Sequence, residues 1–150
     1  MTQSNPMVPV TLGLAGLLPF LATSAAAAFL PSWQAVATLA AALYGIAILS
    51  FLGGIHWGRA LTTGRAGEYV GSVVPSLVAV FAMVLPPPWA LGVLSSAFAV
   101  VGAIDVALLS KTGPAWFARL RLVLTVVVVI ALAVSAAYAP ASGPMFGLLG

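Results

Sequence analysis

The chain has 150 residues, of which 63% are hydrophobic and only 5% are charged, and its mean hydropathy is +1.21. Soluble domains carry roughly a quarter charged residues, so this composition excludes a water-facing globular domain and predicts an integral membrane protein. The net charge of +3 does not indicate a nucleic-acid partner, because the basic residues lie in short segments between apolar runs and form no basic face.

Five apolar runs have the length and composition of transmembrane helices. A bilayer core about 30 Å thick needs roughly 20 apolar residues in helical form. We predict spans over about residues 8–30, 33–61, 68–85, 89–110 and 115–138, followed by a tail over 139–150 at or beyond the membrane surface. Strands are not expected, because an open sheet would leave unpaired backbone groups in lipid. The predicted fold is therefore a single all-α membrane domain over residues 1–150.

Prolines and polar connections define the ends and the bends of these spans. The first run lacks the preceding Lys or Arg of a secretory signal peptide, so we interpret it as a retained span. Pro19 and Pro75 are expected to kink the first and third spans, since proline removes a backbone donor. The prolines at 86–88 are expected to end the third span. Polar loops are predicted over 62–67 and 111–114.

The distribution of basic residues predicts the orientation of the bundle. With five spans, the N-terminus and the second-to-third and fourth-to-fifth connections lie on one side. All the basic residues lie on that side: Arg59, Arg65, Lys111, Arg119 and Arg121. The positive-inside rule therefore predicts that this is the cytoplasmic or matrix side and that the C-terminus lies on the other.

Ionisable residues at one depth of the predicted bundle form a candidate polar cluster. His56, Asp105 and Arg121 each lie roughly one to two helical turns from the inner boundary. Arg59 and Arg119 lie nearer the surface, where long side chains reach water. A buried, unpaired carboxylate costs about 2 kcal/mol or more, so Asp105 is expected within reach of a cation.

Two interpretations of the polar cluster remain open at this point. It is either a structural ion-pair network between helices, or a relay or binding site for protons or anions, since ionisable groups within spans often line transport paths. The predicted outer half of the bundle holds no chain of polar residues that would continue such a path. This distribution favours the structural interpretation.

Small residues recur along the second span at Ser50, Gly54 and Gly58. This spacing predicts a smooth stripe that allows a neighbouring helix to approach closely, within the bundle or in a partner.

Catalytic residues and a metal are not expected, because one histidine, two carboxylates and no cysteine cannot supply three or four zinc ligands. No phosphate-binding loop or nucleophile motif is present, and no cofactor is expected.

The segment Ser-Phe-Leu-Gly-Gly-Ile-His-Trp-Gly at residues 50–58 carries a family resemblance. Together with Val-Pro-Ser-Leu at 74–77, Asp105 and Arg-Leu-Arg at 119–121, it resembles an uncharacterised family of small bacterial inner-membrane proteins. That family is related to mitochondrial transmembrane protein 69, and the similarity covers about residues 8–138. The resemblance implies a multi-pass protein of the bacterial or mitochondrial inner membrane. It offers no known activity that could be carried over to this chain.

Two functions are compatible with this sequence. The first is a non-enzymatic accessory, assembly or stabilising protein that packs in the bilayer against other membrane proteins or against copies of itself, because short loops leave little surface for soluble partners. The alternative is a small permease or ion-coupled carrier that uses His56, Asp105 and Arg121.

Overall fold

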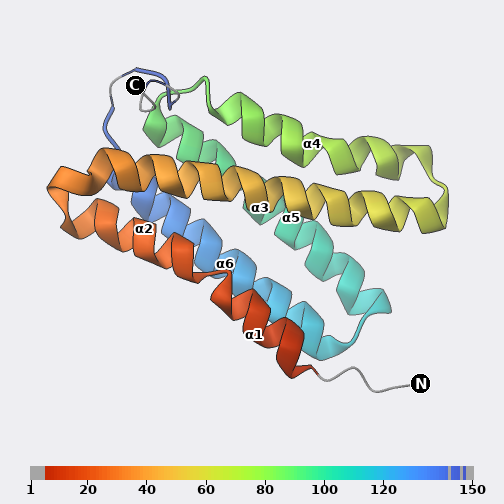
Figure 1. Cartoon of the computed structure of the whole chain (residues 1–150). Helices are drawn as coiled ribbons and strands as arrows, with labels where there is room; N and C mark the ends of the chain where they lie inside the picture. The colour runs from red at the N-terminus through yellow and green to blue at the C-terminus, as the bar shows by residue number, and fades with distance from the viewer. Residues whose placement is uncertain (1–5, 142, 146, 148–150) are drawn as a thin grey trace.

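The computed structural model describes residues 6–141, 143–145 and 147, and the regular elements of this part are all helical. Figure 1 shows them in chain order: α1 (Met7–Ala15), α2 (Leu18–Phe29), the short 3-10 helix η1 (Pro31–Trp33), α3 (Gln34–Thr63), α4 (Ala66–Ala82), α5 (Pro87–Thr112) and α6 (Ala115–Tyr138). Four stretches are long and apolar enough to cross a membrane: Met7–Phe29, Pro31–Thr63, Pro87–Lys111 and Ala115–Tyr138. With 17 residues, α4 is shorter than these four.

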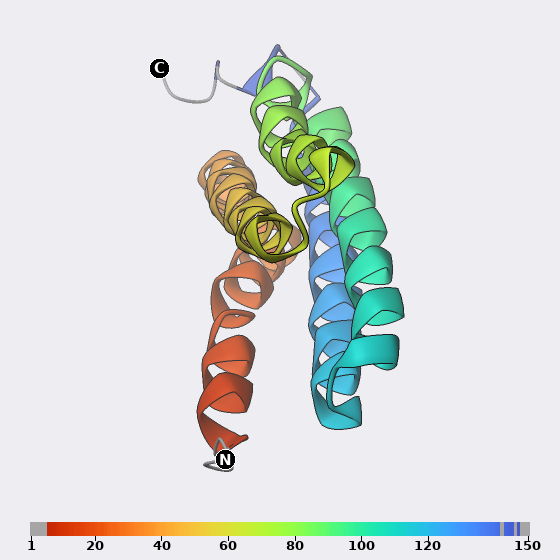
Figure 2. The ribbon, with the colours of Figure 1, turned by 90° about the vertical axis from the view of Figure 1, so that its right-hand side faces the viewer.

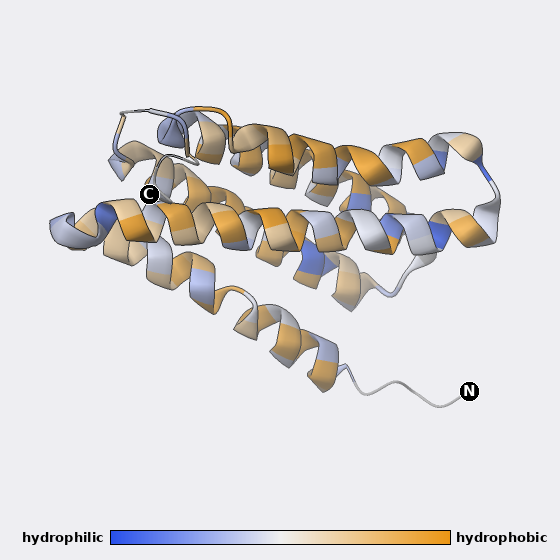
Figure 3. Ribbon diagram, turned by 45° about the horizontal axis from the view of Figure 1, so that its top comes forward, coloured by the Kyte–Doolittle hydropathy of each residue, from blue (hydrophilic) through white to orange (hydrophobic). Residues whose placement is uncertain are grey.

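The helices form two antiparallel pairs that cross each other. In Figure 1, α3 and α4 lie side by side, and α5 and α6 pass beneath them at an angle, with α2 alongside α6 and α3. Figure 2 shows the same two pairs from the side, with α1 extending away from α3. The first described residues, the α3–α4 connection and the α5–α6 connection lie at one end of the molecule. Most of the strongly hydrophilic helical residues gather toward this end, while the helices are otherwise largely apolar (Figure 3).

Prolines begin helices in this structure more often than they interrupt them. The prolines at 86–88 were expected to end the third span, but α4 already ends at Ala82, and Pro87 and Pro88 form the first turn of α5. Proline fits the first helical turn because the missing N–H has no partner there. Pro75 lies buried inside α4, which continues through it.

The first span is interrupted just ahead of Pro19, whose missing N–H leaves the Ala15 carbonyl without its helical donor. The first span is broken between Ala15 and Leu18, and Pro19 lies in the first turn of α2. At the break, the Tyr44 hydroxyl of α3 donates a hydrogen bond of 3.1 Å to the Gly16 carbonyl. This contact satisfies a carbonyl at a helix end that would otherwise lack a partner in an apolar surrounding.

A core of large apolar side chains holds α2, α3, α5 and α6 together. Phe20 is 2% exposed, and its ring makes edge-to-face contacts with Tyr44 and Phe98 at centroid distances of 4.9 and 5.8 Å. Leu49, Leu94 and other leucines around these rings are fully buried. At the opposite end from the charges, Met145 is also fully buried and its N–H donates to the Leu85 carbonyl at 2.7 Å, so the described tail packs onto the α4–α5 connection.

Close helix contacts occur at glycines other than those predicted. A Cβ added to Gly53 would lie 2.5 Å from the carbonyl oxygen of Ser72 in α4. The predicted packing residues Gly54 and Gly58 are exposed, with nothing within 4 Å of an added Cβ, and Ser50 is half-buried. The interpretation that the stripe packs inside the bundle is therefore wrong for the two glycines, and the alternative, packing against a partner, stays a prediction. The face of α3 that meets α4 contains Gly53, one residue before Gly54. It is therefore rotated by about 100° from the face that carries Gly54 and Gly58.

Adjacent glycines in α3 offer a matched test of this packing. We expect Gly53→Ala to lower the free energy of unfolding by about 1–3 kcal/mol, because a backbone carbonyl cannot move aside easily. The control Gly54→Ala should leave stability unchanged or raise it by up to about 1 kcal/mol, since alanine favours the helix. Thermal or denaturant unfolding in detergent measures both. Equal effects of the two substitutions would contradict the assigned α3–α4 contact.

Candidate functional site

Asp105 joins three helices through both of its carboxylate oxygens. The Nε2 atom of His56 in α3 lies 2.5 Å from Oδ1. In α6, the Nε and Nη2 atoms of Arg121 lie 2.7 and 2.6 Å from Oδ2. We call these three residues the triad. Hydrogen bonds of this length to a charged group are the strong, charge-assisted kind.

Asp105 and Arg121 meet because α5 and α6 form a helical hairpin. The two residues lie at equal sequence distances on either side of Gly113, where the chain turns, so antiparallel helices bring them to the same level. One turn further along, Gly102 permits a close approach, because an added Cβ would overlap the Thr125 side chain. The resulting proximity brings a guanidinium and a carboxylate into direct contact.

The triad is largely shielded by the protein itself. The side chains of His56, Asp105 and Arg121 are 17%, 15% and 15% exposed. An ion pair in such a place is weakly screened, and removing one partner leaves an uncompensated charge. Arg121 has five N–H donors, and its contacts with Asp105 use only those on Nε and Nη2.

Among the described residues, the two remaining members of the predicted cluster form no ion pair with Asp105. Arg59 pairs instead with Glu68 of α4 at 3.5 Å, a carboxylate that also contacts Arg65 at 3.5 Å and accepts a 2.8 Å hydrogen bond from the Thr63 hydroxyl. Arg119 is exposed, and within the described chain it forms no ion pair with Asp105. The ion pairs of Asp105 in the described chain are thus limited to His56 and Arg121, while Arg59 lines the cavity beside them.

The Glu68 network was missed by the sequence analysis. Glu68 follows the turn at Gly64 about as closely as Arg59 precedes it, and this symmetry is the signal that would have paired them. Gly64 has φ +67°, a left-handed conformation that glycine adopts without strain, and it ends α3. The network therefore ties the α3–α4 connection together at the same end of the molecule as the triad.

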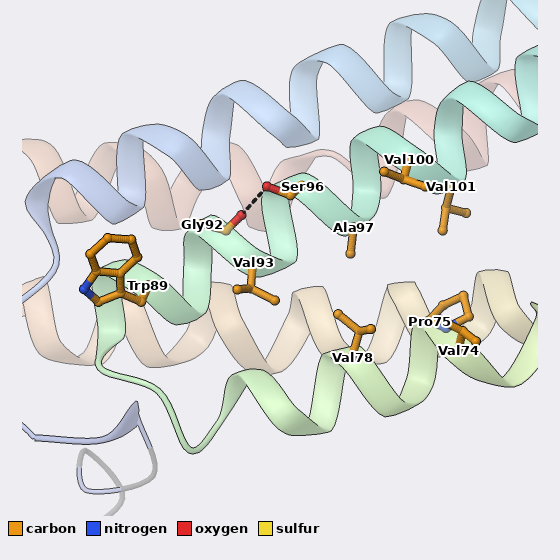
Figure 4. Close-up of a pocket in the computed structure, with 10 residues that line it drawn as sticks. All are labelled: Val74, Pro75, Val78, Trp89, Gly92, Val93, Ser96, Ala97, Val100 and Val101. Atoms are coloured by element: carbon orange, nitrogen blue, oxygen red, sulfur yellow. Dashed lines mark hydrogen bonds between the residues drawn. The ribbon is translucent and has the colours of Figure 1, made fainter.

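A cavity of about 300 Å³ adjoins the triad. It is lined by His56, Asp105, Arg121 and Arg59 together with apolar side chains of α1, α3, α5 and α6. A larger hollow lies elsewhere, between α4 and α5, with about 600 Å³ and no ionisable lining residue (Figure 4). In that groove the Ser96 hydroxyl bonds the Gly92 carbonyl at 2.9 Å. Of these two cavities, only the one beside the triad has ionisable residues in its lining.

Neutralising Asp105 tests whether the triad stabilises the fold. We expect Asp105→Asn to lower the free energy of unfolding in detergent by about 1–3 kcal/mol, because the Arg121 charge loses its partner. Replacing both residues, as Asp105→Asn with Arg121→Gln, should restore much of the loss. Glu68→Gln is the control, and it should have a smaller effect because its ion pairs are longer and more exposed. A double variant less stable than Asp105→Asn alone would contradict this account.

Comparison with known proteins places the chain in a family. The family model described as "Protein of unknown function (DUF3429)" matches residues 5–137. Transmembrane protein 69 of Xenopus tropicalis is 33% identical over 140 residues, which are 87% of this chain and 54% of that protein, so the chain spans about half the length of this relative. No solved structure matches. The matched region includes the triad and nearly all of every helix, and the chain thus belongs to the DUF3429 family of proteins of unknown function, to which transmembrane protein 69 is related.

Proposed function

We propose that this protein is a five-span, non-enzymatic accessory component of a larger complex in the bacterial inner membrane, or in the mitochondrial inner membrane of a eukaryote. Four apolar stretches have the length of full spans, and in this proposal the shorter apolar helix α4, which packs along α3, is the fifth. A helix of 17 residues rises about 26 Å, slightly less than the bilayer core, so flanking residues or local thinning complete the crossing.

The proposed orientation rests on the basic residues. Arg59, Arg65, Lys111 and Arg121 lie in or near the connections at one end of the bundle, together with Arg119. With five spans, this end faces the cytoplasm or the matrix, and the C-terminus lies on the opposite side.

A reporter fused after Gly150 tests the orientation. In a bacterial host we expect a fused alkaline phosphatase to be active and a fused green fluorescent protein to be dark, because the C-terminus reaches the periplasm. A fusion within the α3–α4 connection should give the reverse pattern. Cytoplasmic behaviour of the C-terminal fusion would contradict a five-span topology with its N-terminus inside.

The accessory role rests on the outward-facing small residues of α3. Gly54 and Gly58 do not pack inside the bundle, because both are exposed with no neighbour within 4 Å of an added Cβ, and Ser50 of the same stripe is half-buried. In lipid, helices associate through van der Waals contact at such small residues. The stripe is a surface on which a transmembrane helix of another protein packs closely, and the short loops leave the membrane as the main place for contact.

Purification in mild detergent tests this role. We expect a membrane protein to co-purify in stoichiometric amount, and we expect Gly54→Leu to reduce its recovery at least about tenfold, since a bulky residue prevents close helix approach. Gly71→Leu is the matched control, because Gly71 is also exposed and unobstructed, but on α4. Recovery of this chain alone, or equal effects of the two substitutions, would contradict the accessory role.

The cavity beside the triad favours a second candidate, a small permease or ion-coupled carrier. A cavity of about 300 Å³ lined by an imidazole, a carboxylate and a guanidinium has the residues to bind and release a small ion. A double Asp105→Asn, Arg121→Gln variant that folds and assembles normally but lacks cellular function would favour this carrier over the accessory protein.

A further inference from the structure

Two adjoining cavities lie between the helices beside the triad. The polar cavity, of about 300 Å³, holds the ionisable residues described above. The apolar cavity, of about 270 Å³, is lined by side chains of α1, α2, α3, α5 and α6 that are apolar except for Arg121 and Thr125. The two share five lining residues: Gly13, Phe51, Leu52, Arg121 and Leu124. Together they have the size of pockets that hold small ligands, roughly 300–1,000 Å³.

The lining of the polar cavity contains more cationic than anionic side chains, and one of the cations, Arg59, also pairs with Glu68 outside the lining at 3.5 Å. The lining contains two guanidinium groups, those of Arg59 and Arg121, and one carboxylate, that of Asp105. Asp105 is already occupied by the triad contacts, whereas Arg121 retains N–H donors on Nη1 beyond those contacts. Arginine donors in this arrangement favour an oxygen anion such as a phosphate.

The opposite chemistry of the two cavities suits an amphiphile. One end offers cationic donors and the other offers Leu12, Leu17, Ile48 and other apolar side chains. Arg59 is 41% exposed at the basic end of the bundle, where the headgroups of anionic lipids lie in the proposed orientation. A ligand with its charged group at this end would extend its chain toward the middle of the membrane.

The short helix α1 forms a wall of both cavities. Pro9 lines the polar cavity, Leu12 and Gly16 line the apolar one, and Gly13 lines both. Gly16 and Leu17 interrupt the helix between α1 and α2, and the main neighbour of α1 is α6. A wall held by so few neighbours gives a lipid chain a lateral path from the bilayer.

We propose that the two cavities form one binding site for an anionic phospholipid. Its phosphate lies beside Arg121 and Arg59 in the polar cavity, and one acyl chain occupies the apolar cavity between α1, α2 and α6. The site is independent of the accessory role and of the carrier role, because it requires neither a protein partner nor transport.

Photolabelling in vesicles tests this site. The protein is reconstituted in phosphatidylcholine vesicles with a trace of phosphatidylglycerol that carries a diazirine on one acyl chain, and the labelled residues are mapped by mass spectrometry. We expect the label to concentrate within residues 12–17 and 120–128, and to exceed that from a phosphatidylcholine probe with the same chain by about tenfold. Arg59→Gln should reduce this headgroup preference and leave the labelled positions unchanged.

Substitutions at two neighbouring residues of α6 distinguish labelling by a lipid inside the cavity from labelling by lipids that contact the outer surface of the helices. Leu124 lines both cavities, so Leu124→Trp should lower labelling by about tenfold through loss of space. The control Val123→Trp, at a residue 51% exposed, should label as the unaltered protein does. Ile55→Trp, at an exposed residue lining the polar cavity, replaces Leu124→Trp if the latter fails to fold. The proposal is overturned by labelling spread evenly over the exposed helices, by equal labelling from the two lipids, by a folded cavity variant that labels normally, or by preference for a free fatty-acid probe.

Discussion

The carboxylate of Asp105 is the point on which this bundle depends. In a nearly uncharged chain, apolar helices in lipid have little to fix their relative depth, because sliding one past another changes no hydrophobic contact with solvent. Asp105 supplies that register, since its two oxygens bind α3 through His56 and α6 through Arg121. The cost of exposing any of these groups to lipid restricts the three helices to one alignment.

Around this fixed point, the remaining contacts follow from small residues and ring packing. Gly53 allows α4 to approach α3, and Gly102 allows α5 to approach α6 close to the triad. Farther away, Phe20 packs against Tyr44 and Phe98, which positions the broken first span. The same break leaves α1 loosely attached beside the two cavities, so the element with the fewest contacts borders the most polar interior of the protein.

The sequence predicts where the helices lie in the chain better than it predicts which face of each helix packs inside the bundle. The fifth predicted span coincides with α6 at 115–138, because the prolines on either side of this long apolar run limit where its helix can begin and end. The packing stripe could not be chosen from spacing alone, since Gly45, Leu49 and Gly53 recur with the same period as Ser50, Gly54 and Gly58. The carbonyl left free at the break before Pro19 finds its partner in Tyr44, 28 residues away, and the pairing of Arg59 with Glu68 depends on how sharply the chain turns at Gly64. Tertiary contacts decided each of these cases.

The composition of the chain permits one direct measurement of the central contact. His56 and Asp105 are the only histidine and the only aspartate in the sequence, so ¹⁵N-histidine and ¹³C-aspartate label one imidazole and one carboxyl group. Solid-state NMR dipolar recoupling in lipid bilayers then reports a single nitrogen-to-carbon distance. We expect about 3–4 Å between Nε2 and the carboxyl carbon, as a hydrogen bond requires. A distance beyond about 6 Å would show that Asp105 does not join α3 to the hairpin of α5 and α6.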